Sequence, residues 1–390
     1  MTNYGYNKNT YCTNAFGGFD SWAGAVCCKV YPRKPGASFY EIINSEVTKH
    51  IQKDLLNGIQ SSYCKECWQQ EKHGVKSLRI NQTFMQLIDQ EAEQIHWRNI
   101  IKEEIYNKKI RNFTINSGNM CNLACRTCHP NLSSGHWNES EYKNSTNKYP
   151  KIIFKPKVEK TSIDLLLKED YSSIQNVQIL GGEPFLNLDH LAVIEKIIQD
   201  GNAKNCTLTY TTNMTVKLPE KIKNIAKNFK RIVLMMSLDA TGKPFSYIRT
   251  TGDWQIVKEN LRNLLLVAKE YNLNLNINVA LSVLNLLYLE EIYKLAEIIR
   301  NKITYCDVQL QFVTDPKHYS ANILKDTEKD KIIQLLLNSE SDLQPIVSYV
   351  KQSVFCPSSR QRFFEEIEFT KQYRGLDIYE YLPELMSLLD

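Results

Sequence analysis

Short apolar runs and longer runs with helical periodicity alternate along the middle of the chain. Six short runs, rich in Val, Ile, Leu and Thr, are typical of buried strands; they cover residues 113–117, 177–180, 207–211, 232–238, 275–281 and 308–313. Between them lie helical patterns with an apolar stripe, clearest at residues 254–271 and 287–299. Asp253 stands where it can cap the first of these two helices.

This alternation predicts an α/β fold in which helices flank a parallel sheet, either open or barrel-like. In such folds the residues that carry chemistry lie at the carboxyl ends of the strands. The first predicted strand leads directly into the cysteine-rich run MCNLACRTCHP, and the second ends in the tetrapeptide GGEP. Both motifs therefore fall at the edge of the sheet where a site is expected.

The pattern also predicts a division of the chain into four parts. Residues 1–80 are rich in Tyr, Gly and Cys and lack the β–α alternation, which indicates a small Cys-rich domain. A polar helix over about residues 81–110 links it to the α/β core at residues 111–316, and residues 317–390 form a C-terminal helical extension. Residues 132–160 are a long polar insertion, either a lid or binding loop or a plain surface excursion.

Composition narrows the class of protein. Against 43 Asp and Glu, 48 Lys and Arg give a net charge of +5, which is too weak to predict a nucleic-acid partner. The N-terminus has no signal-peptide pattern and no apolar stretch is long enough to cross a bilayer, so we expect a cytoplasmic protein without a membrane partner. Most of the 11 cysteines are clustered, and in a reducing compartment clustering favours metal binding over disulfides.

The run after the first strand places Cys121, Cys125 and Cys128 within eight residues. Three thiolates can bind three corners of a cluster, but they cannot close a tetrahedral metal site alone. Such a site needs a fourth ligand from elsewhere or leaves one metal position open. An iron–sulfur cluster whose fourth iron binds a small molecule fits the second alternative.

Together, the cysteine triplet, the β–α alternation and GGEP resemble the radical S-adenosylmethionine (SAM) superfamily over about residues 110–315. The resemblance implies a partial (β/α)6 TIM-like barrel. It also implies a [4Fe–4S] cluster on Cys121, Cys125 and Cys128, with SAM bound to the fourth iron.

Further site residues follow from this resemblance. The SAM amino group is expected at the GGEP turn, formed by Gly181, Gly182, Glu183 and Pro184. Asn213 is expected at the ribose or carboxylate of SAM, and Ser237 and Asp239 near the ribose. Arg249 resembles the residue that pairs with the SAM carboxylate or with a substrate acid. For each of these residues, ordinary turn or cap chemistry is the alternative.

The N-terminal cysteines form a second candidate metal site. Cys64 and Cys67 make a Cys-x2-Cys pair, which is half of a tetrahedral site, and Cys12, Cys27 and Cys28 are available to complete it. Their order resembles the auxiliary-cluster region of SPASM/twitch enzymes, here placed before the barrel as in the N-terminal-twitch subgroup. We therefore expect an auxiliary [4Fe–4S] cluster, with structural zinc as the alternative. Spacing does not decide between Cys27 and Cys28.

The resemblance implies an enzyme. A flavodoxin- or ferredoxin-type donor reduces the first cluster, SAM is cleaved to methionine and a 5′-deoxyadenosyl radical, and this radical takes hydrogen from a peptide or small-molecule substrate. An auxiliary cluster can then accept an electron, which gives a net oxidation or modification. The alternatives are a zinc-bearing binding module and an iron–sulfur scaffold without turnover. The substrate is not encoded in any motif.

Overall fold

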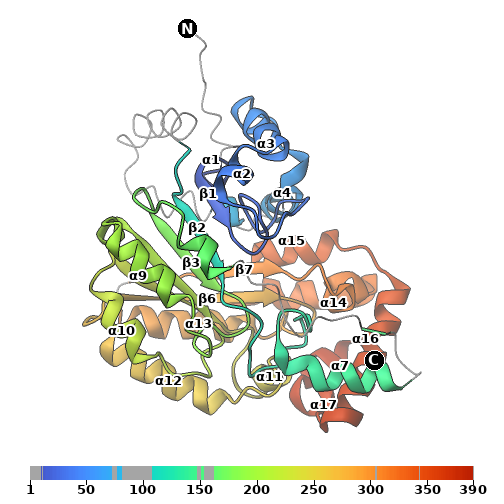
Figure 1. Cartoon of the computed structure of the whole chain (residues 1–390). Coiled ribbons are helices and arrows are strands. Elements are labelled where there is room, and N and C mark those ends of the chain that lie inside the picture. The colour runs from blue at the N-terminus through green and yellow to red at the C-terminus, as the bar shows by residue number, and fades with distance from the viewer. Residues whose placement is uncertain are drawn as a thin grey trace.

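In the computed structural model, seven strands form one parallel sheet in chain order, and helices cover its outer face (Figure 1). The strands are β1 (Gly18–Asp20), β2 (Asn112–Asn116), β3 (Asn176–Leu180), β4 (Thr207–Thr212), β5 (Arg231–Ser237), β6 (Leu273–Leu281) and β7 (Val308–Phe312). The structure describes residues 10, 12–72, 77–80, 108–146, 151–152, 162–303, 305–341 and 343–389. The predicted α/β fold with a parallel, curled half-barrel sheet is confirmed.

The six predicted strands correspond to β2–β7. They are joined by helices that include α9 (Leu191–Gln199), α10 (Glu220–Ala226), α11 (Gly242–Ile248), α12 (Trp254–Val267) and α13 (Leu289–Arg300). The side chain of Asp253 caps α12 by accepting a hydrogen bond from the Gln255 backbone, as predicted. Apolar residues on the outer face of the sheet pack beneath these helices; Ile179 of β3 and Val193 of α9 are fully buried. The remaining face of each strand is left free to line the inside of the curl.

The N-terminal region adds a strand that the sequence patterns do not predict. In β1, three residues pair in parallel with β2, and the ring of Phe19 stacks on that of Phe113 at 5.2 Å. Around it lie α1 (Asn14–Gly17), α2 (Phe39–Ile43), α3 (Glu46–Leu56), η1 (Ser62–Cys64) and α4 (Lys65–Lys72). A three-residue strand is too short to show periodicity. The predicted linking helix lies mostly on residues 81–107, outside the described residues.

The insertion after the cysteine run begins as helix, with η2 (Ser134–His136) and α7 (Trp137–Ser145), and α8 (Ile163–Leu166) precedes β3. After β7 come η4 (Lys317–Tyr319), η5 (Ala321–Ile323), α14 (Asp326–Leu337), α15 (Gln344–Gln352), α16 (Pro357–Arg374), α17 (Ile378–Tyr381) and α18 (Pro383–Leu389). Figure 1 shows α7 beside α16, and the ring centroids of Tyr142 and Phe369 lie 6.2 Å apart. Within the described part of the chain, no helix has the length and apolarity needed to cross a bilayer.

Candidate active site

The cysteine loop, which we define as residues 117–128, follows β2 and runs beside the end of α11. The backbone amides of Ala124 and Arg126 donate hydrogen bonds to the carbonyls of Thr250 (2.9 Å) and Ile248 (2.8 Å). These two bonds bring the loop against the segment that carries Arg249. A loop held by backbone hydrogen bonds can keep three cysteine side chains in a fixed relation.

A second support comes from the start of the insertion. Ser134 accepts a hydrogen bond from the Cys121 backbone amide at 3.0 Å, and Ser133 donates one to the carbonyl of Leu123. The Nε2 atom of His136 lies 3.0 Å from the carbonyl of Cys125, and both residues are buried. The first residues of the insertion thus clamp the cysteine loop, so this part is not a plain surface excursion.

The GGEP turn packs directly against the cysteine loop. Gly181 and Gly182 have φ angles of +95° and +42°, a region that residues with a side chain rarely adopt. A Cβ on Gly181 would lie 2.0 Å from Oδ1 of Asn116, and one on Gly182 would lie 2.2 Å from the carbonyl of Met120. The glycines are therefore required for contact with the loop, whatever else their carbonyls bind.

Glu183 of the same turn is fully buried and bridges two strand ends. Its carboxylate accepts hydrogen bonds from the Asn213 backbone at 2.7 Å and from the Thr212 hydroxyl at 3.0 Å. Burial raises the pKa of Glu183 to about 7, against the lowering effect of these hydrogen bonds. The observed contacts make Glu183 a connector between the GGEP turn and the end of β4; Pro184 follows it in the turn.

Two polar side chains reach the sulfur atoms of the triplet. The Nη1 atom of Arg249 lies 3.8 Å from Sγ of Cys125, and Nδ2 of Asn213 lies 3.8 Å from Sγ of Cys121. Asn213 also donates to Oδ1 of Asn122 at 3.0 Å, which fixes its orientation. The structure therefore brings together predicted site residues that follow β2, β4 and α11.

Asp239 stands behind Arg249. It is fully buried, and its Oδ2 lies 2.7 Å from Nε of Arg249 while its Oδ1 accepts from the Ala280 backbone at 2.7 Å. Both carboxylate oxygens thus contact the protein itself, and the ion pair with Arg249 holds that guanidinium toward Cys125. Ser237, at the end of β5, is also buried. Contact of Asp239 and Ser237 with the ribose remains a prediction.

The donor set of the triplet fits an iron–sulfur cluster, since thiolates are the ligands such clusters use. Burial raises the pKa of Cys125 to about 11 and that of Cys128 to about 12, so these thiols ionise at neutral pH only with a compensating positive charge. Across the described ranges, no three His, Cys, Asp or Glu side chains converge as the ligands of a single metal ion. That arrangement is compatible with ligands to separate corners of a cluster.

The N-terminal cysteines meet in a separate pocket between α1, α3 and α4. Cys12, Cys27, Cys64 and Cys67 line it together, and Cys28 does not. The rest of its wall is mostly apolar, with Ile51 and Leu55 of α3, while Lys29 and Arg79 supply positive charge. These four thiols line one apolar pocket, but they do not converge on one point as the ligands of a single metal ion do.

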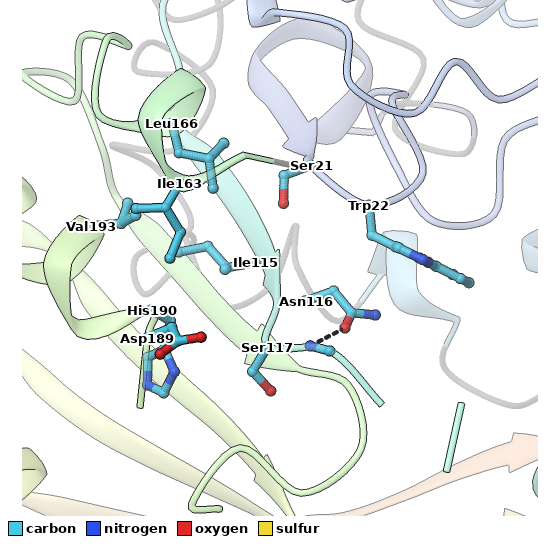
Figure 2. A pocket seen from close by; sticks show the side chains of 11 residues that line it. Ser21, Trp22, Ile115, Asn116, Ser117, Ile163, Leu166, Asp189, His190 and Val193 are labelled. Carbon is cyan, nitrogen blue, oxygen red and sulfur yellow. Dashed lines mark hydrogen bonds between the residues drawn. The ribbon is translucent and has the colours of Figure 1, made fainter. Parts of the chain in front are cut away.

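An open pocket of about 450 Å³ borders the cysteine loop beyond the ends of β1 and β2 (Figure 2). Asn116 and Ser117 form one side of it, and Ser117 donates to the carbonyl of Gly181 at 3.0 Å. On the other side, His190 is held between the carbonyl of Asn187 (3.0 Å) and the hydroxyl of Tyr210 (3.1 Å). The side chains of Ser117 and His190 are thus engaged by the protein, so they support the active-site loops.

Comparison with known families agrees with this geometry. Residues 115–296 match the family model of the radical SAM superfamily, and this segment includes the triplet, GGEP, Asn213 and Arg249. Residues 115–296 form a radical SAM domain. The superfamily predicted from the motifs is therefore confirmed for this segment. The twitch or SPASM subgroup has no such support.

The curated relatives are distant. An uncharacterised protein of Methanocaldococcus jannaschii is 29% identical over 183 residues, which are 45% of this chain and 54% of the relative. A probable GTP 3′,8-cyclase of Methanococcus maripaludis strain C6 is 28% identical over 165 residues, 42% of this chain and 48% of the relative. The chain thus spans about half the length of the curated relatives it matches.

Among solved structures, native anSMEcpe with bound AdoMet aligns with 68% of this chain and 62% of its own, at 14% identity and a TM-score of 0.36. The same protein with bound AdoMet and the Cp18Cys peptide aligns with 58% of this chain and 60% of its own, at 15% identity and a TM-score of 0.35. Similarity at this level carries no argument about function.

Several residues of the site carry no signal in the sequence. Arg126, Ser133, Ser134 and His136 support the cysteine loop through contacts that only the fold creates. Only their closeness to the triplet in the sequence indicates that they could belong to the site. No motif marks them, because each works through a hydrogen bond to a neighbour's backbone or to a distant helix.

Proposed function

We propose that this radical SAM protein cleaves SAM reductively at a [4Fe–4S] cluster on Cys121, Cys125 and Cys128. When bound, the cluster supplies one electron to SAM, whose cleavage gives methionine and a 5′-deoxyadenosyl radical that takes hydrogen from a substrate. The observation that carries the proposal is the convergence of Arg249, Asn213 and the GGEP turn on the three-cysteine loop.

The chain's own residues have distinct tasks in this proposal. Arg249 and Asn213 can donate hydrogen bonds toward cysteine sulfurs, and such bonds stabilise negative charge and tune the reduction potential of a thiolate-bound cluster. The remaining donors of Arg249 and the backbone of Gly181 and Gly182 are available for the carboxylate and amino groups of SAM. Glu183 and Asp239 hold these elements in place.

We propose that the electron comes from a flavodoxin- or ferredoxin-type donor and that the substrate is a peptide or a small molecule. That some distant relatives are named GTP 3′,8-cyclases places GTP among the small molecules to be tested.

We further propose an auxiliary [4Fe–4S] cluster on Cys12, Cys27, Cys64 and Cys67. The support is the pocket these four cysteines share, together with its apolar wall. Lys29 and Arg79 at the same pocket offset the negative charge of a thiolate-bound cluster. Structural zinc uses the same ligands and is decided by metal analysis.

The test is anaerobic reconstitution, a count of iron, sulfide and zinc per chain, and then dithionite and SAM with a count of 5′-deoxyadenosine. About eight irons with SAM cleavage would support both clusters, since each contains four. About four irons with cleavage would leave the N-terminal site to zinc or to structure. Cys125→Ala is expected to abolish 5′-deoxyadenosine formation; undiminished formation would refute the assignment. Zinc without iron or cleavage would favour a binding module, and iron without cleavage a non-catalytic scaffold.

A further inference from the structure

The inner face of the sheet encloses an open cavity of about 600 Å³ that is separate from the cysteine loop. Residues of β2, β3, β4, β5 and β7 all line it. Strands at opposite sides of a sheet can meet at one cavity only if the sheet curls around it. The cavity is therefore the interior of the half-barrel.

Its wall combines apolar surface with uncharged polar side chains. The polar lining residues are carboxamides and hydroxyls: Asn112, Asn176, Gln178 and Gln309, with Thr114 and Thr209. Apolar surface comes from Leu78, Phe113, Val177 and Met235. Among the described residues that line the cavity, none is charged.

The polar groups at the start of the strands are already paired. Asn176 donates to Oδ1 of Asn112 at 3.0 Å, and Asn112 donates to the hydroxyl of Thr13 at 3.2 Å. By contrast, neither Gln178 nor Gln309 has a side-chain partner within the described ranges, and both are half-buried. Oδ1 of Asn278, the register partner of Gln309, is buried and likewise lacks a described partner. Carboxamides that face an open cavity without a protein partner bind water or a ligand.

Gln178 and Gln309 lie inside the barrel, two and three residues before the carboxyl ends of β3 and β7, where SAM is proposed to bind. Gln178 precedes Gly181 by three residues, roughly 10 Å along the strand at about 3.3 Å per residue. A substrate seated on Gln178 and Gln309 would thus face the edge where the GGEP turn and Asn213 stand.

On this basis, and resting on the proposed function, we infer that the barrel interior binds a neutral substrate through an amide group. A carboxamide presents one acceptor and two donors, which complement the C=O and N–H of a peptide bond or an acetamido group. A phosphate-bearing substrate would meet no charged partner among the described residues that line this cavity. Arg249, whose guanidinium reaches Sγ of Cys125, is already paired with Asp239.

The test measures binding to the reconstituted protein with SAM present and no reductant. The probes are a pool of neutral tripeptides blocked at both ends, N-acetylglucosamine, and GTP, each followed by saturation-transfer NMR and titration. We expect a neutral probe to bind. Gln178→Glu and Gln309→Glu should each weaken that binding about tenfold, with circular dichroism and iron content unchanged. Gln334→Glu, on the exposed face of α14, is the matched control and should have no effect.

The peptide and acetamido probes distinguish the two sources of an amide. Binding of GTP alone, binding of none of the probes, or neutral binding that survives both glutamate substitutions would overturn the inference. None of these results depends on SAM cleavage, so a failure here differs from a failure of the proposed function, which the 5′-deoxyadenosine count detects.

Discussion

Arg126, between the second and third cysteines of the loop, pairs with Glu139 of α7: Nη2 lies 3.0 Å from Oε2, and both side chains are almost fully buried. Arg374 of α16 donates to the same oxygen at 2.9 Å, and Lys143 lies 3.4 Å from the other. Lys143 in turn pairs with Glu366 of α16 at 2.7 Å. The cysteine loop is thereby tied to α7 and to the C-terminal helices by one charged network.

Removing the central anion should therefore weaken both the fold and the loop. Glu139→Gln leaves Arg126, Arg374 and Lys143 without their shared carboxylate, and loss of one partner of a buried pair typically costs about 3–5 kcal/mol. We expect a loss of about 3 kcal/mol in the free energy of unfolding, measured by urea titration, and poorer retention of iron after reconstitution.

The matched control uses an exposed pair. Glu259 lies 3.8 Å from Lys217, and both side chains are mostly exposed, so Glu259→Gln should cost less than about 1 kcal/mol. Equal effects of the two substitutions would show that the network does not support the loop.

Gly181 offers a test of the contact between GGEP and the cysteine loop. Gly181→Ala combines a positive φ with a Cβ 2.0 Å from Oδ1 of Asn116 and 2.7 Å from the carbonyl of Gly118 in the cysteine loop. Gly201→Ala has a φ of +88° and meets no atom within 4 Å. Both should lose about 1 kcal/mol from backbone strain. We expect only Gly181→Ala to lose iron as well, because the turn must move away from the loop. Similar iron contents in the two variants would contradict this.

Asp239→Asn tests the positioning of Arg249. The amide keeps an acceptor for the Ala280 backbone but turns a donor toward Nε of Arg249, so the guanidinium loses its anchor. We expect the affinity for SAM, measured by anaerobic equilibrium dialysis, to fall at least tenfold while the iron content stays the same.

Asp253→Asn is the control, since asparagine caps a helix as well as aspartate and this residue caps α12. If both variants bind SAM like the unmodified protein, Asp239 has no part in presenting Arg249.

The sequence was sufficient to predict the strands of the core and the triplet, because both depend on local patterns. Strands β2–β7 follow apolar runs, and the cysteines follow β2 within a few residues. The roles of Arg126 and Glu183 could not be predicted, since their partners lie between 13 and 244 residues away and depend on tertiary folding. Strand β1 was not predicted because its three residues are too few to show a hydrophobic periodicity.

The structure also distinguishes Cys27 from Cys28, which sequence spacing does not. Both Cys27 and Cys28 were candidates for the N-terminal site, and adjacent residues cannot be distinguished by counting. In the fold, Cys27 lines the pocket with Cys12, Cys64 and Cys67, and Cys28 does not.

This difference gives a prediction with a built-in control. Cys27→Ala should remove about four irons per chain, as should Cys64→Ala, because a [4Fe–4S] cluster needs all four cysteines here. Cys28→Ala, one residue away and equally small a change, should retain them. If the site holds zinc, the same pair of variants should differ by about one zinc ion. Retention of metal by Cys27→Ala together with its loss from Cys28→Ala would reverse the assignment, and full retention of metal by both variants would exclude the doublet as a source of ligands.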